Sequence, residues 1–164
     1  MTMTARDAES PPPDPPPTDF ADFYRDAWPG AVKLAGLLTQ NARTAEDLAQ
    51  EAFTKMYTRW SRVEHPHAYL RTAVVNACRS SFARAHRERT KLPLVDRPST
   101  TDIAFDELAD AVAALPFRQR AVLVLRYHGD LSEAEIAEAL GCRPGTVKSL
   151  ASRALASLKK GIEE

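Results

Sequence analysis

Residues 131–160 read LSEAEIAEALGCRPGTVKSLASRALASLKK, a stretch that predicts two helices joined by a tight turn. Ser132 can cap the first helix while Glu135 returns the hydrogen bond, which together form a capping box. Gly141 is expected to end that helix, because glycine adopts the left-handed terminal conformation without steric cost. Pro144 suits the first turn of the second helix, because a backbone N–H at that position has no partner within the helix and its absence costs nothing.

The second of these helices separates an apolar face from a basic one. Its apolar stripe consists of Val147, Leu150, Ala151, Ala154 and Leu158. The other side carries Gly145, Lys148, Ser149, Ser152, Ala156 and Lys159, with Arg153 at the border. Small residues mixed with Lys, Ser and Arg allow a helix to enter a major groove and contact phosphates and base edges. We therefore interpret the stretch as a DNA-reading helix-turn-helix rather than a solvated helix of an ordinary bundle.

The distribution of charge agrees with a polyanionic partner, although the total does not. The chain has 22 basic and 22 acidic residues, so its formal net charge is zero. Basic residues nevertheless outnumber acidic ones over residues 20–91, and residues 143–160 contain five basic residues and no acidic one. The excess acid lies in residues 1–19 and 92–115. Two basic patches separated by acidic sequence suit a protein that touches nucleic acid at two places.

Several classes of protein are excluded by what the sequence lacks. No apolar run is long enough for a membrane span, and the N-terminus has no apolar segment typical of a signal peptide. Cys78 and Cys142 are isolated, and His65 and His67 are too few for a metal site, so no metal or cofactor is expected. No nucleophile motif or phosphate-binding glycine loop argues for an enzyme with a small-molecule substrate. Both cysteines are interpreted as small buried residues in a reducing cytoplasm.

The first half of the chain predicts a disordered tail and three helices. Residues 1–18 contain SPPPDPPPT and cannot pack. A first helix is expected from Asp19 to about Gln40, with an interruption and a kink at Pro29 and Gly30. The second, TAEDLAQEAFTKMYTRW, opens at Thr44. Its apolar stripe is Leu48, Ala49, Ala52, Phe53, Met56, Tyr57 and Trp60, and its opposite face is Asp47, Gln50, Glu51, Thr54 and Thr58.

The third predicted helix, from Pro66 to about Arg87, carries a second candidate nucleic-acid surface. One side holds Leu70, Val74, Ala77, Cys78, Ser81, Phe82 and Ala85, and the other holds Tyr69, Thr72, Asn76, Arg79 and Arg87. On the second side an aromatic ring can stack on an unstacked base, an amide can read its edge and arginine can hold the backbone. Tyr69 as a half-buried packing residue is the alternative.

The remaining sequence predicts a linker and a second helical unit. Residues 89–102 have no periodicity and contain Pro93 and Pro98. Helices are then expected at 103–115 and 116–127, ahead of the helix-turn-helix. The prediction is an all-α chain with two small helical domains, at 19–88 and 103–164, joined by a flexible linker.

This order of motifs resembles a bacterial RNA polymerase sigma factor of the extracytoplasmic-function type. The resemblance covers roughly residues 20–160 and rests on AEDLAQEAFTKMYTRW, HPHAYLRTAVVNACRSSFAR and ALPFRQRAVLVLRYHGDLSEAEIAEALGCRPGTVKSLASRALASLK. The GTVKS…SRAL ending is similar to that of actinobacterial members. The resemblance implies that the two domains are sigma regions 2 and 4, and that the partners are core polymerase, promoter DNA and an anti-sigma factor.

The resemblance also implies a role for each face. The residues expected to dock on core polymerase are Asp47, Leu48, Gln50, Glu51 and Phe53. Those expected at the minus-10 element are Trp60, Tyr69, Thr72, Asn76, Arg79 and Arg84. Those expected at the minus-35 element are Arg143, Thr146, Lys148, Ser149, Ser152 and Arg153. Leu150 stands where these proteins frequently carry Arg, so more of the DNA contact falls to Lys148 and Arg153.

Two other functions fit parts of the sequence. An autonomous helix-turn-helix regulator would bind an operator by itself, normally as a dimer. Such a regulator would not require the polar faces of the second and third predicted helices. An interaction module that binds polymerase but not DNA would not need the basic helix at 144–160. A promoter-specificity subunit accounts for all three faces.

Overall fold

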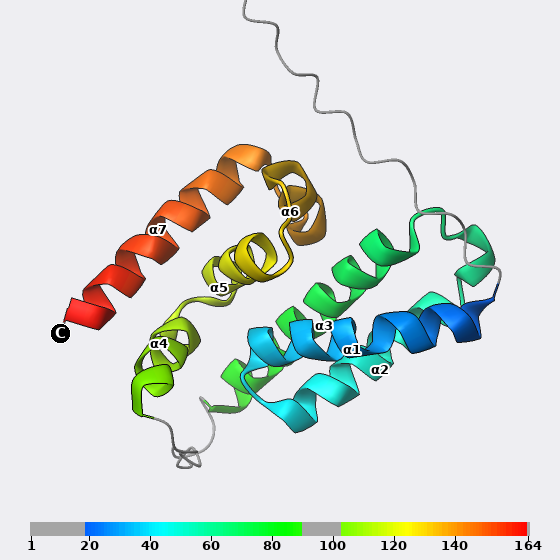
Figure 1. Ribbon diagram of the computed structural model, residues 1–164, viewed down its shortest axis with the longest axis horizontal. Coiled ribbons are helices and arrows are strands. Elements are labelled where there is room, and N and C mark those ends of the chain that lie inside the picture. The colour runs from blue at the N-terminus through cyan, green and yellow to red at the C-terminus, as the bar shows by residue number, and fades with distance from the viewer. Residues whose placement is uncertain (1–18, 90–102, 164) are drawn as a thin grey trace, which may run out of the picture.

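The structure is a computed structural model that describes residues 19–89 and 103–163. The predicted tail at 1–18 and nearly all of the predicted linker lie outside these residues. Within them the chain is helical and contains no strand, which confirms the all-α prediction (Figure 1). The elements are α1 (Phe20–Thr39), α2 (Ala42–Tyr57), η1 (Trp60–Arg62), α3 (Pro66–Arg89), α4 (Ile103–Ala114), α5 (Phe117–Leu123), η2 (Val124–His128), α6 (Glu133–Leu140) and α7 (Pro144–Glu163).

Helix α1 has the predicted bounds and a defined cap at each end. The side chain of Asp19 accepts a hydrogen bond from the backbone N–H of Ala21, at 3.2 Å. Gln40 takes the left-handed conformation, with φ of 57°, and its N–H donates to the Gly36 carbonyl. Pro29 lies inside a continuous helix, so the predicted interruption does not occur.

Helix α2 begins and ends earlier than the sequence predicted. Asn41, not Thr44, is the cap: its side-chain oxygen accepts from the N–H of Thr44 at 3.0 Å. The helix stops at Tyr57 because the Arg59 N–H bonds to the Met56 carbonyl and tightens the last turn. Tyr57 is 65% exposed, so its place in the predicted apolar stripe is wrong, although its ring meets Phe20 edge-on.

Trp60 belongs to the short 3₁₀ turn η1 rather than to α2. The turn redirects the chain, and the indole ring then packs against α1. Its centroid lies 5.1 Å from that of Phe20 and 5.5 Å from that of Phe23. The Phe23 ring also meets the ring of His67, in the first turn of α3, with their centroids 5.0 Å apart.

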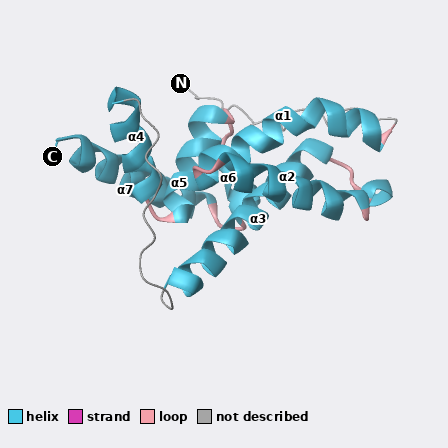
Figure 2. Cartoon of the chain, turned by 90° about the horizontal axis from the view of Figure 1, so that it is seen from below, coloured by secondary structure: helices cyan, strands magenta, loops and turns pink. Residues whose placement is uncertain are grey.

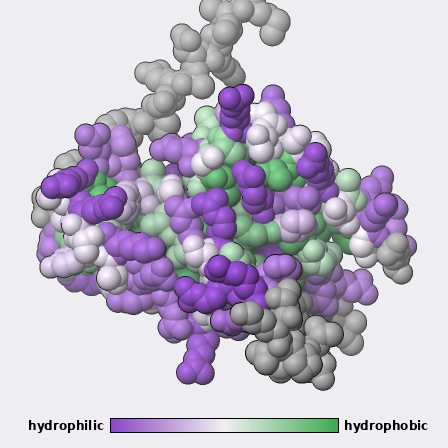
Figure 3. Space-filling view, turned by 180° about the vertical axis from the view of Figure 1, so that it is seen from behind, coloured by the Kyte–Doolittle hydropathy of each residue, from purple (hydrophilic) through white to green (hydrophobic). Residues whose placement is uncertain are grey.

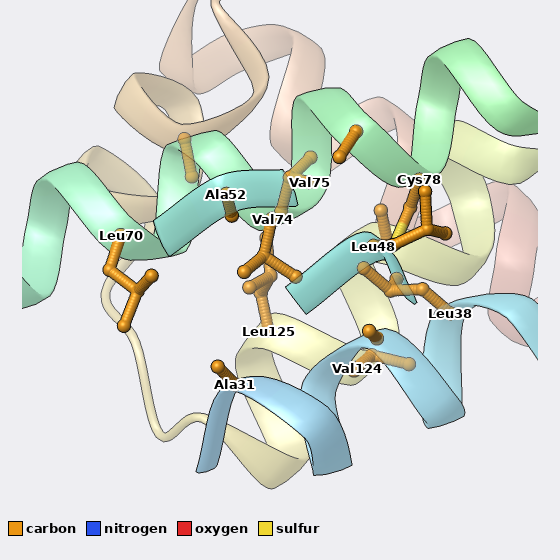
Figure 4. Close-up of a cluster of buried hydrophobic side chains, with 14 of the residues drawn as sticks. Ala31, Leu38, Leu48, Ala52, Leu70, Val74, Val75, Cys78, Val124 and Leu125 are labelled. Carbon is orange, nitrogen blue, oxygen red and sulfur yellow. The ribbon is translucent and has the colours of Figure 1, made fainter. Parts of the chain in front are cut away.

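The two helical units share one hydrophobic core. Figures 1 and 2 show α1, α2 and α3 together on one side and α4, α5 and α7 on the other, with α6 between them. Val124 and Leu125 of η2 belong to the same buried cluster as Ala31, Leu38 and Val74 of the first unit (Figure 4). In Figure 3, hydrophobic side chains show between hydrophilic ones over the middle of the molecule. The sequence did not predict this direct contact between the units.

The segment between α5 and α6 departs from a simple helix and turn. Residues 124–128 form a π-helix, and the chain leaves it through Gly129. A Cβ at Gly129 would lie 2.8 Å from the Leu125 carbonyl oxygen, so a larger residue would force the backbone to shift. Asp130 follows with φ of 53°, and the turn delivers the chain to Ser132 at the start of α6.

Candidate nucleic-acid interface

The helix-turn-helix of α6 and α7 forms as the sequence predicted. Ser132 Oγ accepts from the Glu135 N–H at 3.2 Å, and the Glu135 carboxylate accepts from the Ser132 N–H at 2.8 Å. Gly141 is left-handed, with φ of 64°. Its N–H donates to the Glu138 carbonyl and that of Cys142 to the Ala137 carbonyl, a Schellman ending that fixes the angle of the turn.

Helix α7 presents the predicted face to solvent. Val147, Ala151 and Ala154 are buried and hold the helix against α5 and α6. Arg143, Lys148, Ser149, Ser152 and Arg153 are exposed, and Thr146 is half-buried beside them. The Lys148 ammonium lies 3.8 Å from the Glu133 carboxylate in an exposed pair. Such a pair contributes little, so Lys148 remains available to another anion.

The predicted face of α3 lines a cavity. Tyr69, Thr72 and Asn76 are half-buried on it, and the Asn76 side-chain oxygen accepts from the guanidinium of Arg79. Tyr69 and Thr72 line a cavity of about 730 Å³, and a smaller hollow of about 180 Å³ next to it includes Asn76. Tyr69 also packs against the core, as the alternative interpretation expected, while part of it lines the cavity.

The cavity also contains residues that the sequence analysis did not single out. They are Arg59, Arg62, Val63, Glu64, His65 and Ala68 from the segment around η1, and Glu138 from α6. The basic run in RWSRVEHP, immediately before α3, was the available signal for the first group. Trp60 does not line the cavity, because its ring is packed against α1. Arg79 and Arg84 are exposed further along α3.

The predicted docking face of α2 is only partly available to a partner. Asp47, Gln50 and Glu51 are exposed. Leu48 is 7% exposed and Phe53 is 1% exposed, so these two predicted docking residues lie in the core of this conformation and present little or no surface to a partner. Both lie on the apolar side of α2 and position the helix in the core.

The exposed residues of this face are held from within the first unit. Tyr24 Oη donates to the Gln50 side-chain oxygen at 3.0 Å, which links α2 to α1. The Glu51 carboxylate lies 3.1 Å from the Lys55 ammonium, one turn along α2. These contacts leave a compact polar face on which Asp47 and Glu51 lie one turn apart.

Cys78 is not a reactive thiol. Burial, with the nearby charge of Glu51 as a smaller cause, raises the pKa of the Cys78 thiol to about 12. The thiol therefore stays protonated and unreactive. Cys142 is half-buried rather than buried as predicted. The described parts of the chain hold no group of side chains suited to a metal ion and no helix able to cross a membrane.

Comparison with known proteins places the chain in a family. Residues 23–88 match sigma-70 region 2, and residues 105–158 match sigma-70 region 4. The chain is 34% identical over 154 residues to the RNA polymerase sigma-E factor of Streptomyces coelicolor, which covers 88% of this chain and 86% of that protein. The chain belongs to the extracytoplasmic-function RNA polymerase sigma factors.

Other relatives of this sigma factor support the same family assignment. It is 31% identical over 149 residues to the ECF RNA polymerase sigma factor SigM of Mycobacterium tuberculosis, covering 86% of this chain and 76% of that one. A solved structure of the sigma factor RpoE in complex with the anti-sigma factor NepR, from Bartonella quintana, has a TM-score of 0.72 and 24% identity over 90% of this chain and 98% of that chain. That structural likeness supports the fold.

Proposed function

We propose that this sigma factor binds core RNA polymerase and directs it to promoters, and that three helices each make a different contact. The exposed face of α2 docks on the polymerase, the cavity-lining face of α3 engages the minus-10 element, and the exposed face of α7 reads the minus-35 element. The supporting observation is that one chain carries an exposed acidic face, a half-buried aromatic–amide face and an exposed basic face on three different helices. An autonomous regulator needs only the last of these.

The finer assignments follow from the same proposal. Regions 2 and 4 correspond to residues 19–88 and 103–164, with 89–102 as the connection. The protein acts in the cytoplasm as a specificity subunit without catalytic chemistry of its own. An anti-sigma factor is the expected regulator, because the resemblance to extracytoplasmic-function sigma factors implies control by such a partner.

The proposal predicts that specific promoter binding depends on core polymerase. The free chain should bind promoter DNA weakly, since each DNA-reading face is small and a single face captures only part of the binding free energy. Added core enzyme should produce a specific footprint. The measurement is protection of promoter DNA by the purified chain with and without core. Tight, specific binding by a dimer of the chain alone would contradict the proposal and favour an operator-binding regulator.

Two substitutions test the assignment of α7. Lys148→Ala and Arg153→Ala should each weaken binding to the minus-35 element by about 1–3 kcal/mol where the side chain reads a base, and by less where it meets phosphate. Both residues are exposed, so the fold should be unaffected. Lys160→Ala, near the end of the same helix, is the control. If both variants transcribe normally from a promoter with its native upstream element, then a face other than that of α7 reads the minus-35 element.

A further inference from the structure

Three aromatic side chains form a row along one side of α1. Phe20, Tyr24 and Trp28 follow one another at intervals of one helical turn, so they lie on the same face of the helix. The rings of Tyr24 and Trp28 are stacked with their centroids 5.3 Å apart, and the centroids of Phe20 and Tyr24 lie 6.3 Å apart. We call these three side chains the aromatic row.

The aromatic row is anchored in the core on one side and meets solvent on the other. All three rings lie against the buried Phe53 of α2, at centroid distances from 4.7 to 6.4 Å. Each residue of the row is nevertheless half-buried rather than buried. The row therefore presents a well-positioned aromatic surface that also carries an indole N–H and a phenol hydroxyl.

The chain itself contains a segment whose chemistry matches such a surface. Residues 11–17 read PPPDPPP and lie outside the part of the chain that the structure describes. Prolines have no backbone N–H to place in a helical core, but a run of them favours the extended polyproline II helix. Such helices bind surfaces lined with aromatic side chains, because little conformational entropy is lost on binding and their carbonyl oxygens have no partners of their own.

The place of this segment in the chain allows it to reach the aromatic row. Residue 17 comes three positions before Phe20, the first residue of both α1 and the row. A polyproline II helix rises about 3.1 Å per residue, so residues 11–17 can span about 20 Å. Phe20 and Trp28 are separated by about 12 Å along the axis of α1. A segment that turned back just before Asp19 would therefore be long enough to cover the whole row.

The aromatic row borders the face of α2 that is proposed to dock on core polymerase. Tyr24 Oη donates a hydrogen bond to the side-chain oxygen of Gln50 at 3.0 Å. Gln50 belongs to the docking face, together with Asp47 and Glu51. A segment that lay over Tyr24 would therefore crowd a partner that approaches Gln50.

We propose that residues 11–17 dock on the aromatic row of the same chain and thereby compete with core polymerase for the adjoining face of α2. The competition rests on the proposed function, whereas the docking does not. Because the segment is joined directly to α1, its effective concentration at the row is on the order of millimolar, so weak contacts suffice to hold it. The apparent affinity for polymerase is then reduced in proportion to the fraction of chains whose row is free.

The docking is tested in the full chain by nuclear magnetic resonance. The chain has two tryptophans, Trp28 in the row and Trp60 in η1, so its spectrum contains two indole N–H signals, which Trp28→Phe assigns. The test protein, called the proline variant, carries Pro11→Ser, Pro12→Ser, Pro13→Ser, Pro15→Ser, Pro16→Ser and Pro17→Ser. These changes should shift the Trp28 signal, and should shift it further than that of Trp60.

A second set of changes in the same tail is the matched control. The control variant carries Met3→Ser, Thr4→Ser, Ala5→Ser, Arg6→Ser, Asp7→Ser and Ala8→Ser. It has as many substitutions as the proline variant, and its net charge is unchanged because one basic and one acidic residue are lost together. Both indole signals should stay where they are in the parent chain. A Trp28 signal that does not move in the proline variant, or that moves equally in the control, would overturn the docking.

A synthetic peptide of residues 9–18, ESPPPDPPPT, shows whether the shift reports direct contact. Added to the proline variant at a concentration on the order of millimolar, the peptide should return the Trp28 signal toward its position in the parent chain. The parent should respond less, because its own segment occupies the row. A peptide without effect on the proline variant would overturn the docking. So would a parent chain that dimerises in sedimentation when the proline variant does not, since the segment would then bind a second copy.

Competition with core polymerase is measured separately on the same proteins. The proline variant should bind core enzyme about two- to fivefold more tightly than the parent, as expected if about half to four-fifths of the free chains have the segment docked. The control variant should bind as the parent does. Equal affinities of the parent and the proline variant would overturn the competition. If no form of the chain binds core enzyme, the competition fails together with the proposed function, while the indole signals of the free chain still decide the docking.

Discussion

Reversing the charges of Asp47 and Glu51 together is expected to abolish association with core polymerase. Both side chains are exposed on the polar face of α2, one turn apart, and an acidic face would become basic against a complementary partner. Like-charge juxtaposition at an interface costs several kcal/mol. With roughly 1.5 kcal/mol or more lost for each position, the dissociation constant should rise at least about a hundredfold.

The fold should tolerate this change. Neither residue belongs to the buried stripe of α2, and the Glu51–Lys55 pair is exposed and weak. The matched control is Asp22→Lys with Asp26→Lys on α1, where two exposed acids have the same spacing. The measurement is co-purification with core enzyme, alongside thermal unfolding. A charge-reversed α2 that still co-purifies, or a control that does not, would show that the docking face lies elsewhere.

Removing Tyr69 and Asn76 together is expected to block strand opening while leaving polymerase binding intact. Both line hollows beside α3, and neither Asp47 nor Glu51 lines these hollows. Stacking of a base on an aromatic ring is worth about 1–3 kcal/mol, so the double alanine variant should open promoters at least about tenfold less. Closed complexes should still form, because α7 and α2 are unchanged.

The readout is permanganate reactivity of promoter thymines in the presence of core enzyme. Because Tyr69 also packs against the core, the variant must first be shown to be folded by thermal unfolding. Tyr57→Ala is the matched control: it removes an aromatic ring that is exposed on α2 and lines neither hollow. Promoter opening equal to that of the parent would remove α3 from the minus-10 assignment.

Local signals in the sequence determined the helix-turn-helix in full. The capping box of Ser132 and Glu135, the left-handed Gly141 and the proline at the start of α7 all form as expected, because each depends on residues within one turn of one another. The faces of α7 follow from the same periodicity. The sequence could therefore predict which residues of this helix meet solvent.

Element boundaries were less well determined where two local signals competed. Thr44 and Asn41 both offer a cap for α2, and the structure uses Asn41. The periodic pattern ran on through Tyr57 to Trp60, but an i→i+3 hydrogen bond ends the helix and sends the indole toward Phe20 and Phe23. That choice depends on aromatic residues in α1, more than thirty positions away.

The sequence by itself determined the all-α class, the family and the polar faces of α2, α3 and α7. Tertiary structure alone decided that Leu48 and Phe53 are buried in the core, and that the segment around η1 completes the cavity beside Tyr69. It also decided that Arg120 and Glu138 of the second unit meet the first. The physical reason is that helix periodicity records which side of one helix is apolar, whereas contact between distant segments depends on how all the apolar sides pack together.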